Sequence, residues 1–235
     1  MDASIRESGR KLYVRRYNAY QRVNHWITAI LFVVLALTGL AMFYPWLYPL
    51  SALFGGGSAT RNIHPWFGLA LVASFYILAV QFLRNNIPNR DDVKWMLHFR
   101  SVMTNDHEGL PALGKYNAGQ KGVYWSQVFL ILVLLVTGLI AWQMYFGSWT
   151  TIPTQRIALL IHSLAAAIAI TVIIVHIYAG LWIKGTGRAM TRGSVTGGWA
   201  YLHHRKWLRQ SIAQSLAQGT VRGTAVRPRP GVGDD

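Results

Sequence analysis

Four long apolar runs divide the chain, and polar segments separate them. The fourth run, residues 157–183, contains no charged residue. A helix needs about 20 apolar residues to cross a bilayer, so this run predicts a membrane-spanning helix. The other three runs are read in the same way. The predicted spans are residues 26–44, 65–83, 123–146 and 157–183.

The polar segments complete the predicted organisation. Residues 1–22 form a basic N-terminal segment, which we expect to be loosely ordered to about Tyr17. Residues 23–209 form the membrane domain, and the Gly- and Pro-rich residues 210–235 are expected to be disordered. Within the long middle segment, residues 91–103 have the pattern of an amphipathic helix lying in the membrane interface. The first apolar run is not read as a signal peptide, because no small-residue cleavage site follows it.

Composition supports a membrane protein. Hydrophobic residues make up 52% of the chain and charged residues only 13%, whereas about 25% of residues are charged in an ordinary soluble domain. There are no cysteines. This excludes disulfides, thiolate zinc sites, cysteine-ligated iron–sulfur clusters and covalently attached haem. A metal cofactor would therefore be held by histidine or by non-covalent packing.

The distribution of basic residues predicts the orientation. A net charge of +15 would suggest nucleic acid as a partner for a soluble protein. Here 21 of the 23 Lys and Arg residues lie in segments 1–22, 84–122 and 184–235, and the other two lie in segments 45–63 and 147–156. Cytoplasmic segments carry the excess of Lys and Arg. The predicted fold is therefore an all-α integral membrane four-helix bundle with both termini cytoplasmic, in contact with lipid and not with nucleic acid.

Two histidines interrupt the fourth apolar run. His162 and His176 are 14 residues apart, so on a helix they lie about 40° apart around the axis and about 21 Å apart along it. A titratable ring at membrane depth is costly, and it marks a candidate functional site. The spacing indicates two sites, stacked one above the other.

The topology gives each of these histidines one partner at its own depth. His64 opens the second span on the outer side, level with His162, and His25 opens the first span on the cytoplasmic side, level with His176. No carboxylate or thiolate accompanies them. The sequence therefore predicts two b-type haems, each with two axial histidines. Such haems transfer electrons and leave no open iron position for a substrate.

Other readings of these features remain open. A membrane histidine can simply hydrogen-bond another helix, which would make the protein a haem-free anchor or a small transporter. Gly39 lies on the same face of its helix as His25, at the depth of the outer site, and residues 34–40 and 133–139 both end in TGL. Ordinary helix packing could also explain both features. The other histidines are expected to be solvated or lipid-facing; they are His98, His107, His203 and His204.

With these residues in place, the chain resembles the membrane cytochrome b subunit of respiratory formate dehydrogenase, the gamma or b556 type. The resemblance covers roughly residues 13–207. It rests on RVNHW (22–26), IHPWFG (63–68), NNIP (85–88), GKYNAGQK (114–121), LLVTG (134–138), LLIH (159–162), HIYAGLWIKG (176–185) and WAYLHHRKW (199–207).

The resemblance implies a role and a set of site residues. The family's haem ligands correspond to His25, His64, His162 and His176. Its quinone pocket, for ubiquinone or menaquinone, corresponds to Asn117, Gly119 and Gln120, although these residues could equally form a turn before the third span. The implied partners are an iron–sulfur subunit and a catalytic molybdenum or tungsten subunit on the outer face.

The same resemblance implies the reaction and the location. Electrons would cross from the outer to the inner haem and reduce quinone at a site within this chain, in the bacterial inner membrane. The chain would thus be the electron-transfer subunit of a formate:quinone oxidoreductase. The nearest alternatives keep the haems and change the partner to a nickel–iron hydrogenase or a thiosulfate reductase.

Overall fold

The structure is a computed structural model that describes residues 5–8, 11–98, 100–101, 104 and 111–218. The chain forms two compact units. The bundle unit consists of Tyr20–Ile87 and Gly119–Trp182, and the terminal unit consists of Met1–Ala19, Pro88–Ala118 and Ile183–Asp235.

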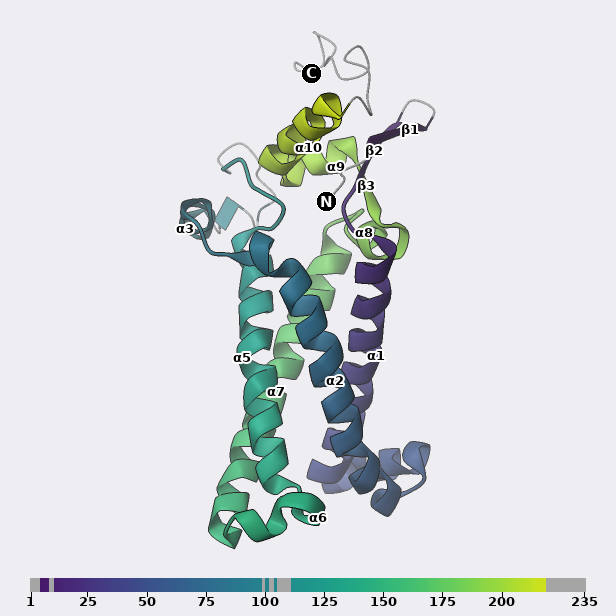
Figure 1. Cartoon of the computed structure of the whole chain (residues 1–235), viewed down its shortest axis with the longest axis vertical. Coiled ribbons are helices and arrows are strands. Elements are labelled where there is room, and N and C mark those ends of the chain that lie inside the picture. The colour runs from purple at the N-terminus through teal and green to yellow at the C-terminus, as the bar shows by residue number, and fades with distance from the viewer. Residues whose placement is uncertain (1–4, 9–10, 99, 102–103, 105–110, 219–235) are drawn as a thin grey trace. The chain divides into compact units, whose positions relative to one another are not determined.

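Four long helices make the bundle unit. They are α1 (Ala19–Phe43), α2 (Gly57–Asn86), α5 (Ala118–Ala141) and α7 (Ile152–Trp182). Figure 1 shows them side by side, with α1 and α5 running in one direction and α2 and α7 in the other. Each is long and apolar enough to cross a membrane, yet only 17–28% of its most apolar window is buried within the protein. Many of the other residues are partly or fully exposed, as on a lipid-facing surface, and the four predicted spans correspond to four candidate membrane-spanning helices.

The helices extend beyond the apolar runs at their polar ends. The first helix begins at Ala19, seven residues before the predicted span starts at 26. The third ends earlier than predicted, at Ala141, because the backbone turns at Trp142 into the short helices α6 (Gln143–Phe146) and η2 (Gly147–Trp149). Hydropathy detects the lipid-facing stretch, whereas the helices continue into polar sequence that hydropathy does not count.

Polar side chains tie the helices together inside the bundle unit. Ser74 on α2 donates to the Asn24 Oδ1 on α1 (2.8 Å), and the Asn24 amide donates back to the Ser74 carbonyl (3.1 Å). Tyr76 on α2 donates to the Val128 carbonyl on α5 (2.9 Å), and Gln127 on α5 donates to the Ala169 carbonyl on α7 (3.2 Å). In an apolar surrounding, such bonds are favoured because an unpaired polar group is costly.

Small apolar clusters fill the space between these polar contacts. Phe75 and Ala79 of α2 pack with Ile131 of α5. Leu130 of α5 packs with two alanines of α7, Ala165 and Ala169. Small residues let membrane helices approach closely.

The bundle unit carries no acidic residue. Neither Tyr20–Ile87 nor Gly119–Trp182 contains Asp or Glu.

The loop between α1 and α2 contains the 3-10 helix η1 (Pro45–Phe54), which is followed by Gly55 with a φ of 85°. That left-handed conformation favours glycine.

A three-stranded antiparallel sheet organises the terminal unit, in the order β1 (Ile5–Ser8), β2 (Lys11–Arg15) and β3 (Ser194–Thr196). The register pairs Val14 with both Ile5 and Val195. Val14 and Val195 are fully buried, so this row forms a small core. The expectation of a loosely ordered N-terminal segment is therefore wrong for the strands.

Short helices complete the described part of the terminal unit. They are α3 (Arg90–Leu97), α8 (Gly187–Arg192), α9 (Gly197–His203) and α10 (Arg205–Ala217). The first begins with a capping box between Asn89 and Asp92 and covers most of the first part of the predicted helix 91–103, of which residues 99, 102 and 103 lie outside the described residues. The expectation of a disordered tail from residue 210 is wrong as far as Ala217, where α10 buries Ser211 and Ser215; residues 219–235 lie outside the described part of the chain.

Candidate functional site

The bundle unit brings together the four histidines in the two pairs that the sequence matched by depth. The rings of His64 on α2 and His162 on α7 have centres 6.4 Å apart, with an angle of 68° between their planes. The rings of His25 on α1 and His176 on α7 are also 6.4 Å apart, with an angle of 54°. We refer to them as the His64–His162 pair and the His25–His176 pair.

The spacing within each pair suits one metal atom between two imidazoles. Metal–imidazole bonds of about 2 Å place the two ring centres about 6 Å apart. Among the described residues, no group of three or more His, Cys, Asp or Glu side chains could share a metal ion. Two nitrogens alone do not complete a protein-only metal site, so each pair fits a metal whose other ligands come from a cofactor.

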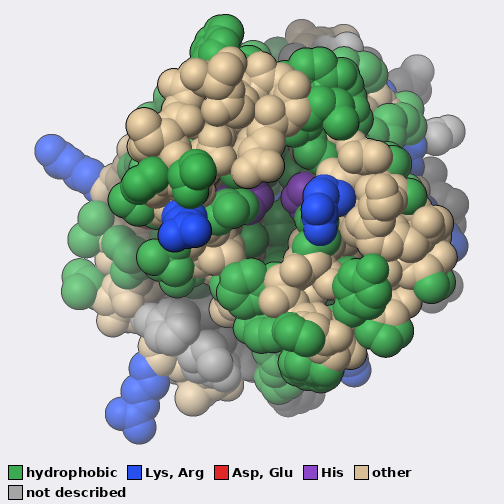
Figure 2. All heavy atoms as spheres, turned by 90° about the horizontal axis from the view of Figure 1, so that it is seen from below, with side chains coloured by type: hydrophobic (Ala, Val, Ile, Leu, Met, Phe, Trp, Pro, Cys, Tyr) green, Lys and Arg blue, Asp and Glu red, His purple; other side chains and the backbone are tan. Residues whose placement is uncertain are grey.

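There is also room for a flat group beside the histidines. A side chain at Gly68, one turn after His64, would meet no atom within 4 Å, and the same holds for Gly180, one turn after His176. Figure 2 views the bundle unit from its lower end in Figure 1, the end where α6 lies. Histidine side chains are visible within a hollow there, with hydrophobic and basic side chains around it. The residues present thus fit a haem at each pair.

Each histidine of the His64–His162 pair is held by a Thr-Gly sequence on the neighbouring helix. The Thr38 hydroxyl of α1 lies 2.7 Å from Nδ1 of His64, and a Cβ added to Gly39 would lie 3.6 Å from His64 Cε1. On α5, the Thr137 hydroxyl lies 2.9 Å from Nδ1 of His162. Gly138 likewise leaves room for the ring of His162, since an added Cβ would lie 3.3 Å from His162 Cε1.

The TGL echo in the sequence therefore marks a repeated structural device. In both copies, the first helix of a hairpin offers a hydroxyl and a gap, and the second helix supplies the imidazole. The echo is visible in the sequence, but the connection of Thr38 or Thr137 with a histidine is not, because the hydrogen bonds join different helices.

The His25–His176 pair has different surroundings. Nδ1 of His25 is buried and has no hydrogen-bond partner among the described residues. Trp26 meets the His25 ring edge-on, with centres 5.6 Å apart. The two pairs thus share their spacing but not their hydrogen bonding.

The residues predicted to bind quinone lie at the start of α5. Asn117 precedes the helix, and Gly119 and Gln120 belong to its first turn. The unit boundary falls between Ala118 and Gly119, so Asn117 belongs to the terminal unit and the other two to the bundle unit. Their role in quinone binding stays a prediction.

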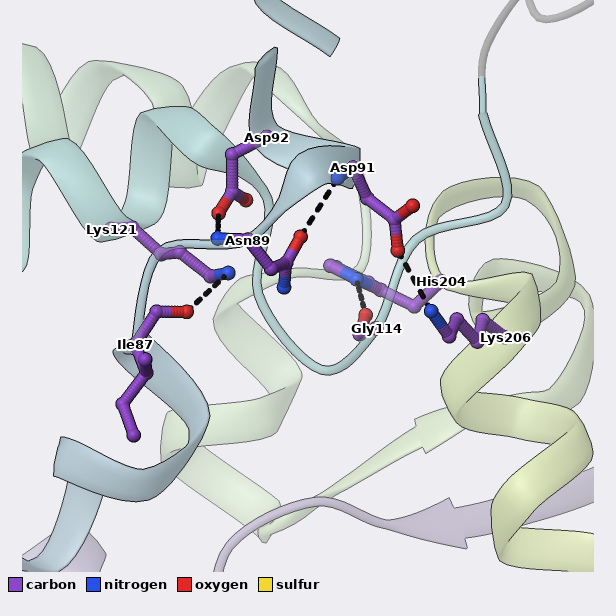
Figure 3. Close-up of polar contacts among 8 residues, drawn as sticks. All are labelled: Ile87, Asn89, Asp91, Asp92, Gly114, Lys121, His204 and Lys206. Atoms are coloured by element: carbon purple, nitrogen blue, oxygen red, sulfur yellow. Dashed lines mark hydrogen bonds and ion pairs between the residues drawn. The ribbon is translucent and has the colours of Figure 1, made fainter. Parts of the chain in front are cut away.

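The last residue of the same motif has a structural role that the sequence did not reveal. Lys121 is only 5% exposed, and its ammonium donates to the Ile87 carbonyl (3.0 Å), just after the end of α2 (Figure 3). Trp125 donates nearby to the Asn86 carbonyl (2.9 Å). A cation is favourable at a helix C-terminus, so these contacts fasten α5 to the end of α2.

A buried arginine centres the terminal unit. Arg16 is 5% exposed, and its guanidinium donates to the Lys115 carbonyl and lies 3.4 Å from Nε2 of His204. Four aromatic rings surround the guanidinium carbon at 4.9–5.8 Å; they belong to Tyr17, Tyr116, Trp199 and Trp207. Cation–π attraction therefore takes the place of a carboxylate partner.

The expectation that His204 is solvated is wrong. The residue is 1% exposed, and its Nδ1 donates to the Gly114 carbonyl (2.8 Å), as Figure 3 shows. Burial, with the Arg16 guanidinium second, lowers the pKa of His204 well below its usual value. His204 is thus a neutral acceptor for Arg16, and the local sequence HHRKW, which is basic, gives no sign of it. His98 is exposed as expected, and His107 lies outside the described residues.

Comparison with known proteins identifies the relatives of this chain. Residues 16–197 match the family model described as prokaryotic cytochrome b561. The chain is 43% identical over 195 residues to the cytochrome b556(fdo) subunit of formate dehydrogenase from Escherichia coli, which covers 83% of this chain and 92% of the relative.

Two further relatives carry similar names. The cytochrome b556 subunit of the nitrate-inducible formate dehydrogenase from Escherichia coli is 39% identical over 80% of this chain and 87% of its own length. The formate dehydrogenase cytochrome b556 subunit from Haemophilus influenzae is 36% identical over 86% of this chain and 85% of its own length. These matches confirm the resemblance inferred from the motifs.

Proposed function

This chain belongs to the prokaryotic cytochrome b561 family, and from that premise we propose that it is the dihaem, quinone-reducing cytochrome b subunit of a formate dehydrogenase complex. The observation that carries the proposal is the pair of histidine sites, each with ring centres 6.4 Å apart. The names of relatives that match over most of their length support formate dehydrogenase as the complex.

The four histidines would act as the axial ligands. His64 and His162 would hold one haem b, and His25 and His176 would hold the other. When bound, each haem supplies an iron that accepts and releases one electron. With both histidines of a pair bound to the iron, each site would serve electron transfer and would leave no position for oxygen or a substrate. Thr38 and Thr137 would fix the orientation of the His64 and His162 rings, because each hydroxyl is hydrogen-bonded to Nδ1 of one of these histidines.

The distribution of Lys and Arg supports an orientation with both termini cytoplasmic. The His64–His162 pair then lies on the outer side and the His25–His176 pair on the inner side. Along α7 the two proposed ligands are 14 residues apart, so they lie about 21 Å apart along the axis of that helix. The partners would be an iron–sulfur subunit on the outer face, which delivers electrons, and a molybdenum or tungsten subunit, which oxidises formate.

The quinone, either ubiquinone or menaquinone, would bind near Asn117, Gly119 and Gln120 and would be reduced there, on the inner side. The amide side chains and the backbone N–H groups can donate hydrogen bonds to quinone carbonyls. Two electrons from the partner and two protons from the cytoplasm convert the quinone to quinol. Because electrons move inward and protons are taken up inside, turnover would transfer charge across the membrane; proton uptake from the outer side would contradict this part of the proposal.

The deciding experiment is a reduced-minus-oxidised spectrum of the purified protein with haem quantified per polypeptide. We expect a b-type band and two haems. His64→Ala should remove one haem and leave the other, because the second haem would be held by His25 and His176 and not by His64. His98→Ala is the matched control, since His98 is an exposed histidine outside the bundle unit, and it should retain both haems.

The result also separates the alternatives. No b-type band would defeat the cofactor assignment and favour a haem-free anchor or transporter. Equal haem loss in both histidine variants would contradict the pairing. Co-purification of the native complex tests the partner, and a nickel–iron hydrogenase or thiosulfate reductase catalytic subunit in place of a formate dehydrogenase would overturn that assignment.

A further inference from the structure

The hydrogen bonds at the His64–His162 pair have a defined direction. The Thr38 hydroxyl donates its one proton to the Val34 carbonyl, one turn back along α1 (2.9 Å). The Leu35 carbonyl is a second acceptor for this proton (3.2 Å), and Nδ1 of His64 lies 2.7 Å from the same oxygen. We assign the proton of His64 to Nδ1, because two backbone carbonyls compete for the single hydroxyl proton; this tautomer leaves the Nε2 lone pair free for a metal.

The same arrangement occurs independently on the other hairpin. The Thr137 hydroxyl donates to the Val133 carbonyl (2.7 Å) and accepts from Nδ1 of His162 (2.9 Å). The two copies agree in residue type, in the contacts of the threonine hydroxyl and in the glycine that follows the threonine. This agreement indicates a requirement of the histidines, because helix packing alone does not need the hydroxyl.

The His25–His176 pair lacks this arrangement on at least one side. His25 Nδ1 is buried without a partner among the described residues. The nearest hydroxyl one turn along α1 belongs to Thr28, which bonds the Asn24 carbonyl (2.9 Å) and the Ser74 hydroxyl (2.7 Å). It is therefore committed to the contact between α1 and α2.

Such a difference has an electronic consequence. An imidazole that donates its Nδ1 proton to an acceptor becomes a stronger electron donor through Nε2. A more strongly donating axial ligand favours the oxidised iron and lowers its reduction potential. Two hydroxyls act on one pair, and neither acts on His25.

We propose that Thr38 and Thr137 are positioning residues that hold the His64–His162 haem at a lower potential than the His25–His176 haem. This inference rests on the proposed function, because it requires two haems. It adds a direction to that function: electrons that enter at the His64–His162 side move toward the higher potential at the His25–His176 side, and the order is set by side chains that touch neither haem iron nor quinone.

The test is a redox titration of the two b-type components in the purified holoprotein. Thr38→Val keeps the shape of the side chain and removes the hydroxyl, and so does Thr137→Val. We expect each variant to raise the midpoint of the same, lower-potential component and to narrow the gap between the two components. Thr38→Ser, which restores the hydroxyl, should return the midpoint toward that of the wild type.

Thr171→Val is the matched control. Thr171 also lies on α7 and also bonds the carbonyl one turn back, at Ala167 (2.9 Å), but it is exposed and bonds no histidine in the structure. It should leave both midpoints unchanged. Electron paramagnetic resonance of the oxidised protein gives a second measurement, because the signal of a bis-histidine haem depends on the angle between its imidazole planes.

The outcomes distinguish this inference from the proposed function. If the wild-type protein contains no haem, the proposed function itself fails. If two haems are present and Thr38→Val and Thr137→Val leave both midpoints unchanged, or shift different components, only the positioning role fails. Loss of one haem in place of a shift would also overturn the tuning role, since the hydroxyls would then serve haem binding.

Discussion

At the scale of single residues, Arg16 shows how a permanent charge can organise a compact unit. A guanidinium stays protonated at any physiological pH, so its neighbours must adapt. His204 is kept neutral by burial and by Arg16. Burial, and Arg16 second, lower the pKa of Lys115 to about 8, whereas burial raises the pKa of Tyr116 well above its usual value. Burial and one buried cation thus act together to lower the pKa of the two basic groups around Arg16.

Lys115 predicts an unusual pH dependence of stability. Between pH 8 and its ordinary pKa of 10.5, Lys115 loses its proton in the native state but keeps it in the unfolded state. The unfolded state then binds more protons, so stability rises with pH in this window. Relative to Lys115→Met, the wild type should gain on the order of 1–2 kcal/mol from pH 7.5 to 10, less than the full shift implies because the side chain keeps some solvent contact.

Thermal denaturation of both proteins in detergent at the two pH values measures this difference. Lys206→Met is the control, because the Lys206 side chain is 51% exposed and forms a surface ion pair with Asp91. It should show no comparable change against the wild type. A Lys115→Met protein that follows the wild type across the whole pH range would show that Lys115 titrates normally.

At the scale of elements, the four helices act as two similar hairpins. In the first, α1 carries Thr38 and Gly39 and α2 carries His64; in the second, α5 carries Thr137 and Gly138 and α7 carries His162. In each hairpin the glycine gives the imidazole of the following helix space to approach the hydroxyl. The fit is closer in the second hairpin, where an added Cβ would be 3.3 Å from the ring instead of 3.6 Å.

This difference separates two otherwise equivalent substitutions. Gly39→Ala should be tolerated with both haems retained, because 3.6 Å is an ordinary contact. Gly138→Ala should displace His162 and destabilise the protein by about 1 kcal/mol, the lower range for overpacking. Haem content and the oxidised-state resonance spectrum report the displacement. Gly122→Ala on the same helix meets no atom within 4 Å and serves as the control; a Gly138→Ala protein that matches it would show that the ring is not constrained there.

The membrane-spanning helices could be predicted from the sequence, because crossing a bilayer requires a long apolar run. An uncharged run such as residues 157–183 predicts a span, and a 14-residue spacing places His162 and His176 on one face. The sheet was not predictable, because β3 pairs with β2 from the opposite end of the chain and neither is long enough to have a clear alternating pattern. The Thr–histidine bonds were missed for a related reason: their partners are adjacent only after the helices pack.

At the scale of the whole molecule, the apolar surface and the basic segments define how the chain sits in a bilayer. Each long helix is apolar enough to cross a membrane, and only 17–28% of its most apolar window is buried, so the protein is a multi-pass membrane protein. The proposed orientation, with both termini cytoplasmic, rests on the 21 Lys and Arg residues in three segments and the two in the others. Long tails count less in this rule, but the middle segment of residues 84–122 alone carries 6 of them.

Reporter fusions test this orientation. Alkaline phosphatase, which becomes active only outside the cytoplasm, should be active when inserted at Gly147 and inactive when fused after Ala217. A fluorescent protein that requires the cytoplasm should give the reverse. A fusion at Gly56, in the other short loop, is the matched control and should behave as the one at Gly147 does. Activity of the phosphatase after Ala217 would invert the assignment of outer and inner sites.

The lack of Asp and Glu in the bundle unit has a consequence for energy conservation. Proton pathways across membranes are commonly built from carboxylates and free histidines. The bundle unit has no carboxylate, and a histidine with both nitrogens engaged has no lone pair left to accept a proton. With the proposed haems in place, the bundle unit would offer electrons a route between the two histidine pairs but would offer protons no carboxylate. Turnover of the proposed complex would then build a membrane voltage that no carboxylate pathway within this unit dissipates.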